Sequence, residues 1–317
     1  MFFYHRAGNI CYIVQDIRIY PLNRKKLEEF FKYLNPGQED KEWGIYLNCA
    51  GKAEIRPGIV YPPPAHPSGY YFTYEKGRIL KEYQVHYITE GEGVYENMSG
   101  RFRISPGSLL FTRPGDWHRF KPKKRTGWVE HYIGFSGYIA HRIFEQPWFM
   151  QKNAVVNVGY REEIIDTYYK IFNFVIEEKP GYQQVSAGMI MKLLGYIVSI
   201  DRQKDFSGKR IEKIIQCACF NIRENVEAKI DFQSFAEENN IGYSYFRKMF
   251  KKYTGIPPVQ YHLDLKVLRA KEMLLQTDKS VKEISYDLGF QSIYYFSRIF
   301  KNKLGVAPSE IRKSVRV

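Results

Sequence analysis

The chain has 317 residues, 44% of them hydrophobic, so it is long enough for about two domains with cores of their own. Its 48 Lys and Arg outnumber its 34 Asp and Glu, and the formal charge of +14 favours a polyanionic partner such as nucleic acid or an anionic membrane. The longest apolar stretches, such as 197–200, are far shorter than the roughly 20 residues that span a bilayer. We therefore expect a cytoplasmic protein that does not associate with membranes.

Residues 43–135 have the pattern of a small β-barrel. Short strands are predicted at 82–89 and 107–112, and clusters of turn-forming residues interrupt the region, for example at 90–93 and 113–116. Closely spaced strands joined by tight turns are typical of barrels and sandwiches. We therefore expect the first domain to be rich in β-structure.

Two amphipathic helices are predicted after the strands, at 161–178 and 183–202, and a linker is predicted at 205–208. Residues 209–317 hold 20 Lys and Arg against 12 Asp and Glu, a net charge of +8, so the polyanion-binding part is expected there. The second helix has an apolar face that can pack on its own barrel or on a second subunit. That face is formed by Val185, Met189, Leu193, Ile197 and Ile200.

An internal repeat with an offset of 50 residues is the strongest signal in the sequence. The segment YFRKMFK at 245–251 matches YFSRIFK at 295–301. In both copies the apolar residues have helical spacing and the basic residues lie elsewhere. Each copy therefore predicts a helix with a cationic surface and a buried stripe, which contains Phe246 and Phe250 or Phe296 and Phe300.

Each copy also carries the local signals of a helix-turn-helix motif. Gly255 and Gly305 can adopt the left-handed conformation that ends a helix. A shorter helix is predicted before each basic helix, at 231–238 and 280–288, and Gly289 suits the tight turn of the second copy. A helix, a tight turn and a basic helix together predict a helix-turn-helix motif.

A further helix is predicted between the two copies, at 259–276. About 18 residues in a helix give a rod of roughly 27 Å. Two recognition helices that are held about 34 Å apart can enter successive major grooves on one side of a DNA duplex. The repeat therefore predicts that one chain reads two adjacent groove segments.

The C-terminal pattern resembles the AraC/XylS family of transcriptional regulators. The matching segments are SVKEISYDLGF at 280–290, YFSRIFK at 295–301 and PSEIR at 308–312. The resemblance covers about residues 209–317 and implies two helix-turn-helix motifs in which early exposed positions of each second helix touch bases. In this sequence those positions carry Ser244, Arg247 and Lys248 in the first motif, and Ile293, Tyr294, Tyr295 and Arg298 in the second.

The chemistry of these side chains agrees with a role at DNA. Arginine is the commonest bidentate partner of guanine, and lysine can also reach the same base edge, which suits Arg247, Lys248 and Arg298. Basic residues further along the helices are expected at phosphates, where they give affinity and salt dependence but little sequence preference. These residues are Lys251, Lys252, Lys301 and Lys303.

Turn signatures at 90–93, 105–108 and 114–118 resemble those of the cupin-like ligand-binding barrel that usually precedes this DNA-binding domain. Enzymatic cupins hold a metal through histidines and a glutamate. The matching positions here carry Arg78, Leu80, Gln84 and His118. A single imidazole cannot hold a transition metal without partners. We therefore expect no catalytic residues, no metal and no cofactor, and a metal-dependent cupin enzyme is the least favoured alternative.

The barrel is expected to bind a small-molecule effector. Period-two alternation places Gln84, His86 and Ile88 on one face of their strand, and Arg78 can share it. The candidate ligand contacts are Arg78, Gln84, His86 and His118. Apolar pockets with a few polar groups bind neutral polar ligands, and many regulators of the resembled family sense carbohydrates, so a sugar is the leading candidate. Aromatic residues in the same region are Tyr70, Tyr71, Phe72, Tyr74, Tyr83, Tyr87 and Trp117.

The sequence thus predicts a multidomain α+β protein, with an N-terminal cupin-like barrel and a C-terminal all-α domain of two helix-turn-helix motifs. The expected partners are double-stranded DNA, the effector and a second copy of the chain, and RNA polymerase is a candidate partner. A ligand-independent regulator whose barrel only dimerises is the alternative, and both activation and repression remain open. The predicted boundaries are 1–158 for the sensor, 159–204 for the helical dimerisation segment, 205–208 for the linker and 209–317 for the DNA-binding domain.

Overall fold

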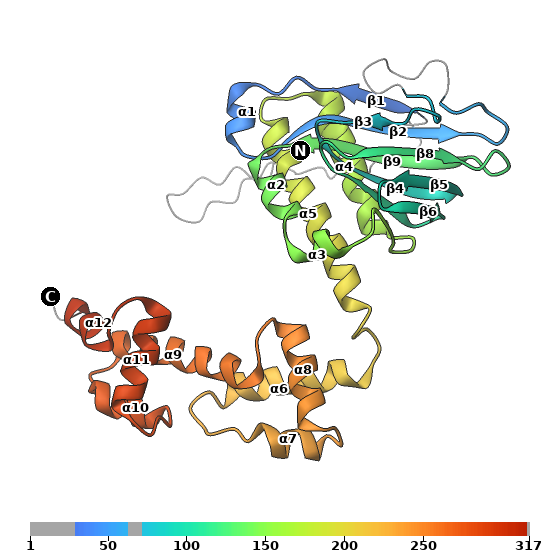
Figure 1. Cartoon of the computed structure of the whole chain (residues 1–317). Helices are drawn as coiled ribbons and strands as arrows, with labels where there is room; N and C mark the ends of the chain where they lie inside the picture. The colour runs from blue at the N-terminus through green and yellow to red at the C-terminus, as the bar shows by residue number, and fades with distance from the viewer. Residues whose placement is uncertain (1–28, 63–71, 316–317) are drawn as a thin grey trace, which may run out of the picture. The chain divides into compact units, whose positions relative to one another are not determined.

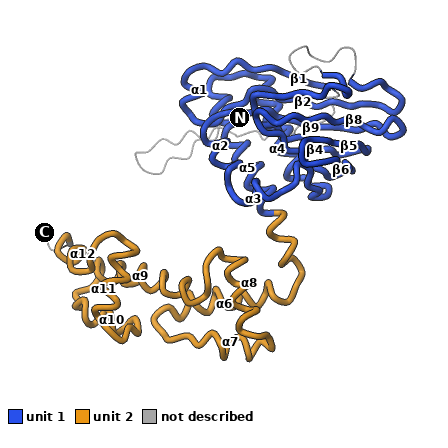
Figure 2. Tube along the Cα trace, in the orientation of Figure 1, with its two compact units in different colours: residues 1–199 blue, residues 200–317 orange. Residues whose placement is uncertain are grey.

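The computed structural model describes residues 29–62 and 72–315. The chain divides into two compact units, residues 1–199 and residues 200–317 (Figure 2). The first unit contains the strands together with several helices, and the second is helical (Figure 1). The predicted fold class is therefore confirmed. In the part of the chain that the structure describes, no helix is both long and apolar enough to cross a lipid bilayer.

The described strands of the first unit form two antiparallel sheets. Sheet A has the strand order β1-β2-β9-β4-β7-β10, and sheet B has the order β3-β8-β5-β6. The strands of sheet A are β1 (Phe30–Tyr33), β2 (Tyr46–Ile55), β4 (Tyr83–Gly91), β7 (Ser108–Thr112), β9 (Trp128–Ser136) and β10 (Val155–Asn157). The strands of sheet B are β3 (Arg78–Ile79), β5 (Gly93–Asn97), β6 (Gly100–Ile104) and β8 (Trp117–Pro122).

An apolar core joins the two sheets. Side chains from both sheets are buried in one cluster, because alternate residues of each strand point to the same face of its sheet. The strands predicted at 82–89 and 107–112 are confirmed as β4 and β7. The buried members of the core are Ile55, Phe72, Ile88, Tyr95, Ile104, Leu110, Phe120 and Trp128.

The two helices predicted after the strands are also confirmed, as α4 (Glu162–Glu177) and α5 (Tyr182–Gln203). Both contact sheet A. Tyr168 of α4 donates a hydrogen bond to the carbonyl oxygen of Val85 at 2.9 Å. The side-chain amide of Gln183 in α5 accepts from the N–H of Leu47 and donates to its carbonyl, at 2.9 and 3.1 Å. The register of β2 and β9 shifts just after Leu47, and Gln183 satisfies both main-chain groups of that residue.

The buried face of α5 differs from the predicted stripe in its first half. Leu193 and Ile197 are buried as expected, but the side chain of Val185 is 44% exposed. Polar Gln183 and Ser186 are buried in its place. Hydrophobicity alone could not find this face, because Gln183 is buried for its hydrogen bonds to Leu47. The described part of the first unit also contains three shorter helices, α1 (Gln38–Glu42), α2 (Tyr138–Phe144) and α3 (Pro147–Gln151).

The second unit contains two hydrophobic cores, one for each copy of the repeat. Its helices match those expected from the sequence, with an additional helix before the first motif and another at the C-terminal end. They are α6 (Arg210–Glu224), α7 (Phe232–Glu238), α8 (Tyr243–Thr254), α9 (Pro258–Gln276), α10 (Val281–Asp287), α11 (Ile293–Leu304) and α12 (Pro308–Val315).

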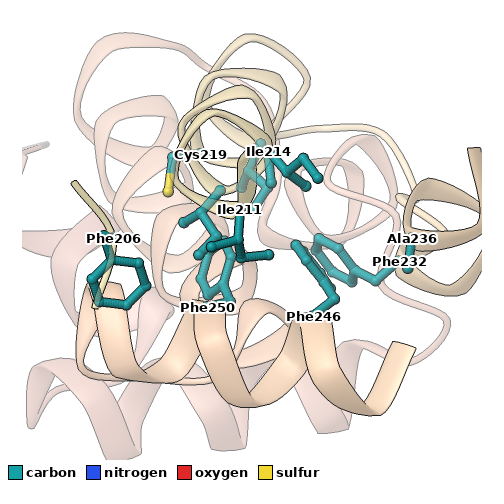
Figure 3. Packing of buried hydrophobic residues seen from close by; sticks show 11 residues of the cluster. Phe206, Ile211, Ile214, Cys219, Phe232, Ala236, Phe246 and Phe250 are labelled. Atoms are coloured by element: carbon teal, nitrogen blue, oxygen red, sulfur yellow. The ribbon is translucent and has the colours of Figure 1, made fainter. Parts of the chain in front are cut away.

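The segment that precedes α6 belongs to the first of these cores. Phe206 is only 4% exposed and lies beside Phe250 and Ile211 in the cluster shown in Figure 3. Its ring meets that of Tyr253 edge-on, with centroids 5.1 Å apart. Residues 205–208, which the sequence predicts to be a linker, therefore include a core residue of the helical unit.

The burial of Phe206 predicts a specific loss of stability. Phe206→Ala should lower the free energy of unfolding of the helical unit by about 3–5 kcal/mol, because it removes a buried aromatic ring and leaves a cavity. Phe220→Ala is the matched control, since Phe220 of α6 is 65% exposed and its loss should change stability by less than about 0.5 kcal/mol. Denaturant unfolding of the full chain, followed by circular dichroism, measures both. Equal effects of the two substitutions would contradict the assignment of Phe206 to the core.

Candidate functional site

The first helix-turn-helix motif consists of α7 and α8. The carboxylate of Asp231 caps α7 by accepting from the N–H groups of Gln233 and Ser234, at 2.9 and 3.1 Å. In the turn that follows, Asn240 has a φ of +51°, which asparagine adopts more readily than most residues with a Cβ. Gly255 ends α8 with a φ of +89°. The local signals therefore define the motif as predicted.

The second motif, α10 and α11, is built in the same way with different residues. Ser280 and Glu283 form a reciprocal capping box at the start of α10. Gly289 forms the turn with a φ of +69°, and Gly305 ends α11 with a φ of +79°. Ser292 caps α11, its hydroxyl accepting from the N–H of Tyr295 at 3.4 Å.

Helix α9 connects the two motifs and contributes to both of their cores. Its N-terminal half packs Tyr261 and Leu265 against the first core, while Val267, Ala270 and Leu274 are buried in the second. With 19 residues, the helix is a rod of about 28 Å. Both motifs are thus packed on one continuous helix, which fixes the spacing between them.

Two polar residues of α9 strengthen this connection. His262 is buried and lies 2.9 Å, through Nε2, from the carbonyl oxygen of Val226, which belongs to the α6–α7 connection. One turn further along, the buried ammonium of Lys266 lies 5.8 Å from the ring centroid of Phe290, just after the turn of the second motif. Burial lowers the pKa of Lys266. The middle of α9 is therefore held by the α6–α7 connection and by the second motif.

The predicted DNA contacts lie on exposed parts of α8 and α11. The aromatic rings of the repeat, Phe246, Phe250, Phe296 and Phe300, are 0% exposed. On α8 the exposed residues include Ser244, Arg247, Lys248, Lys251 and Lys252. On α11 they are Tyr294, Tyr295, Arg298, Lys301 and Lys303. Tyr294 is 87% exposed and Tyr295 is 43% exposed.

The lysines expected at phosphates differ in their surroundings. Lys252 forms an ion pair with Asp205 at 2.7 Å, and Lys303 pairs with Asp264 of α9 at 2.8 Å. The hydrogen bond from Lys252 lowers the pKa of Asp205. Within the described ranges, no ion pair joins Lys251 or Lys301 to a carboxylate. A phosphate contact by Lys252 would have to replace its pair with Asp205, whereas Lys301 needs no such exchange.

The four predicted ligand contacts meet between the two sheets of the first unit. Arg78 donates from Nε to Nε2 of His118 at 3.1 Å, and from Nη2 to Oε1 of Gln84 at 3.3 Å. The same oxygen of Gln84 lies 3.0 Å from Nε2 of His86. We refer to Arg78, Gln84, His86 and His118 as the barrel cluster. The sequence identified these residues separately, and the structure connects them by hydrogen bonds.

Arg78 brings a positive charge into the barrel cluster. Burial and the nearby guanidinium of Arg78 lower the pKa of His118 to about 3, so this imidazole is neutral near pH 7. Its Nδ1 hydrogen-bonds to the carbonyl of Asp116 at 3.1 Å, which leaves Nε2 to accept from Arg78. The guanidinium also lies 4.9 and 5.1 Å from the ring centroids of Phe72 and Phe120. A cation between aromatic rings is suited to bind a polar ligand.

Two buried carboxylates extend the cluster, and the sequence analysis missed both. Glu82 accepts from Nε2 of Gln84 at 2.9 Å. Oε2 of Glu130 lies 3.7 Å from Nδ1 of His86, and neither of these two buried atoms has a hydrogen-bond partner among the residues that the structure describes. Buried polar atoms without partners are costly, so this pair is suited to form hydrogen bonds with a hydroxyl group of a ligand.

One of the missed carboxylates had a signal in the sequence. Glu82 continues the period-two series of Gln84 and His86, so alternation could have identified it. Glu130 and Tyr132 lie on β9, where they pair with Ile88 and His86 of β4. That pairing joins segments more than 40 residues apart in the sequence, and no local pattern could show it.

Most of the aromatic residues that the sequence places near the pocket do not lie at the barrel cluster. Phe72 lies at the barrel cluster, but the ring of Tyr83 packs on Phe144 of α2, and the hydroxyl of Tyr87 donates to the carbonyl of Gly159. Tyr74 contacts Arg119. Successive residues of β8 point to opposite faces of its sheet, and Arg119 lies on the face that points away from the core. The Trp117 indole N–H donates to the carbonyl of Lys76. Tyr70 and Tyr71 lie outside the described residues.

Comparison with known proteins identifies both parts of the chain. The helix-turn-helix domain family matches residues 235–314, and the family of AraC-like ligand binding domains matches residues 60–182. The HTH-type transcriptional regulator YidL of Escherichia coli is 31% identical over 246 residues, which cover 76% of this chain and 78% of that protein.

Two further relatives are similar over most of their length. The arabinose operon regulatory protein of Escherichia coli is 23% identical over 78% of this chain and 87% of its own. The raffinose operon transcriptional regulatory protein of Pediococcus pentosaceus is 22% identical over 78% of this chain and 90% of its own. The paired helix-turn-helix motifs and the preceding barrel agree with these matches, and the chain belongs to the AraC family of DNA-binding transcriptional regulators, not to a family of enzymes.

Proposed function

We propose that the chain regulates transcription in response to a carbohydrate that binds at the barrel cluster. The observation that carries this proposal is the buried set of connected polar groups between the two sheets. It includes one cationic side chain, Arg78, and two carboxylates, Glu82 and Glu130, beside the aromatic rings of Phe72 and Phe120. A sugar offers hydroxyl groups for the polar atoms and apolar C–H faces for the rings.

Two buried atoms, Nδ1 of His86 and Oε2 of Glu130, have no hydrogen-bond partner among the described residues and favour a ligand with hydroxyl groups. Because Nε2 of His86 faces the oxygen of Gln84, this nitrogen donates a hydrogen bond to it. Nδ1 of His86 and the acceptor Oε2 of Glu130 are 3.7 Å apart. A hydroxyl group of a bound sugar both donates and accepts, so it can form hydrogen bonds with both atoms. The operons named for the arabinose and raffinose regulators support the same class of effector.

We propose that α8 and α11 are the recognition helices. Ser244, Arg247 and Lys248 of α8, and Tyr294, Tyr295 and Arg298 of α11, would face base edges, while Lys251, Lys252 and Lys301 would contact phosphates. The effector would act through unequal affinity for two states of the chain that differ in how the helical unit is presented to DNA.

A homodimer is part of the proposal. Val185 on α5 is 44% exposed, so an apolar part of this helix is left for a second chain. Two chains would present four helix-turn-helix motifs and gain affinity through simultaneous binding. Contact with RNA polymerase, a cytoplasmic location and the domain boundaries at 158, 204 and 208 stay predictions.

Two substitutions on α11 distinguish base reading from phosphate binding. Arg298→Ala should reduce the preference for the best duplex over random duplex by about 1–3 kcal/mol, because a bidentate base contact is lost. Lys301→Ala should weaken binding to all duplexes alike and lower the slope of log affinity against log salt by about one. Fluorescence anisotropy with both duplexes over a salt series measures these effects. Equal losses of Arg298→Ala on both duplexes would reject its role in base reading.

The effector site can be tested by ligand-induced stabilisation. A sugar that binds the native state should raise the melting temperature, and at about 100 times Kd the gain is about 2.7 kcal/mol. Gln84→Leu should abolish the shift, because it removes the amide that links Arg78, His86 and Glu82. Tyr74→Phe is the matched control, since it removes a 2.9 Å hydrogen bond to Glu96 away from the barrel cluster.

A panel of neutral mono- and oligosaccharides that includes arabinose and raffinose serves for this screen. If no sugar in the panel stabilises the chain, the proposed effector class is wrong. If a sugar stabilises the Gln84→Leu and Tyr74→Phe variants equally well, the effector binds elsewhere than at the barrel cluster.

A further inference from the structure

The two recognition helices present different chemistry at equivalent positions. With the repeat offset of 50, Ser244 corresponds to Tyr294 and Arg247 to Ser297. At these positions α8 is polar and cationic, because Ser244, Arg247 and Lys248 are exposed there. Both helices expose an equivalent tyrosine, Tyr245 at 49% and Tyr295 at 43%, and α11 adds a second exposed ring, Tyr294, in place of Ser244.

The aromatic surface of α11 is left open by the fold. Tyr294 is 87% exposed and Tyr295 is 43% exposed, although Phe296 beside them is completely buried. The hydroxyl of Ser292 accepts from the N–H of Tyr295, so this polar side chain is used as the helix cap. The guanidinium of Arg298 lies 5.7 Å from the ring centroid of Tyr295, which holds this cation beside the aromatic surface.

DNA offers one apolar group in the major groove, the C5 methyl group of thymine. Burial of apolar surface against this methyl group is favourable, whereas the ring carbons of a tyrosine donate no hydrogen bond to the N7 and O6 acceptors of a purine, and only its hydroxyl group can do so. We propose that Tyr294 contacts thymine methyl groups, so that α11 selects thymine by apolar contact in addition to the hydrogen bonds that Arg298 makes to bases. This inference rests on the proposed function of α11 as a recognition helix.

Removal of single methyl groups from DNA tests this assignment. The full chain first selects its preferred duplex from a random pool, and each thymine of that duplex is then replaced in turn by deoxyuridine, which pairs identically but lacks the methyl group. We expect one or two neighbouring replacements to weaken binding about fourfold each, the effect of losing one buried methyl group. Other replacements should change affinity by less than about twofold.

Two variants at Tyr294 identify the side chain responsible. Tyr294→Ser introduces the residue found at the equivalent position of α8 and should remove the sensitivity to deoxyuridine. Tyr294→Phe should retain it, because the apolar contact does not need the hydroxyl group. Circular dichroism melting of both variants verifies folding, which the exposure of Tyr294 predicts to be unchanged.

The outcomes separate this inference from the function on which it rests. If the chain selects no duplex over random sequence, the proposed function of the helical unit fails, and this inference fails with it. If a duplex is selected but no thymine is sensitive to deoxyuridine, only the inference is overturned. Sensitivity that persists in Tyr294→Ser, or that disappears in Tyr294→Phe, would also overturn it.

Discussion

The shared helix α9 is the constraint on which the DNA-binding unit depends. A helix-turn-helix motif alone has too little apolar surface to fix its position relative to another. Here Leu265 and Tyr261 belong to one core, while Val267, Ala270 and Leu274 belong to the other. A rotation of one motif about α9 would break the packing of side chains in its core. The distance and the relative orientation of α8 and α11 are therefore properties of the fold rather than of a flexible tether.

The segment before α6 extends this constraint toward the N-terminal unit. Phe206 packs in the core against Tyr253, and Asp205 pairs with Lys252 on the same recognition helix. The residues that follow α5 thus touch the helix that is proposed to read DNA. At the barrel cluster, Nδ1 of His86 and Oε2 of the adjoining Glu130 have no hydrogen-bond partner among the described residues, and the proposed ligand would supply one.

Local sequence signals predicted the helical unit well. The helix ends at Gly255 and Gly305, the turn at Gly289 and the buried rings of the repeat all depend on residues within a few positions of one another. In the barrel, alternation found Gln84 and His86 in the same way. Contacts between distant segments could not be predicted: Glu130 approaches His86 only because β9 pairs with β4.

Contacts between residues that are far apart in the sequence also explain two other differences between the prediction and the structure. Phe206 lies in a segment whose charge and glycine indicate a linker, and its burial depends on α8 more than 40 residues later. Lys252 is expected to contact phosphate, and in the structure it also forms an ion pair with Asp205. In each case a residue type that suits the surface or a loop is held by a partner that only the folded chain brings close.

The most direct test of the fixed spacing uses DNA whose two groove segments are moved apart. Duplexes with one, five or ten base pairs inserted between the two boxes of the preferred site are compared for binding of the full chain at physiological salt. Because α9 cannot lengthen or turn without breaking a core, every insertion should reduce affinity to that of a duplex with a single box. Unchanged affinity after a five-base-pair insertion, which turns the second box to the opposite side of the duplex, would contradict the account.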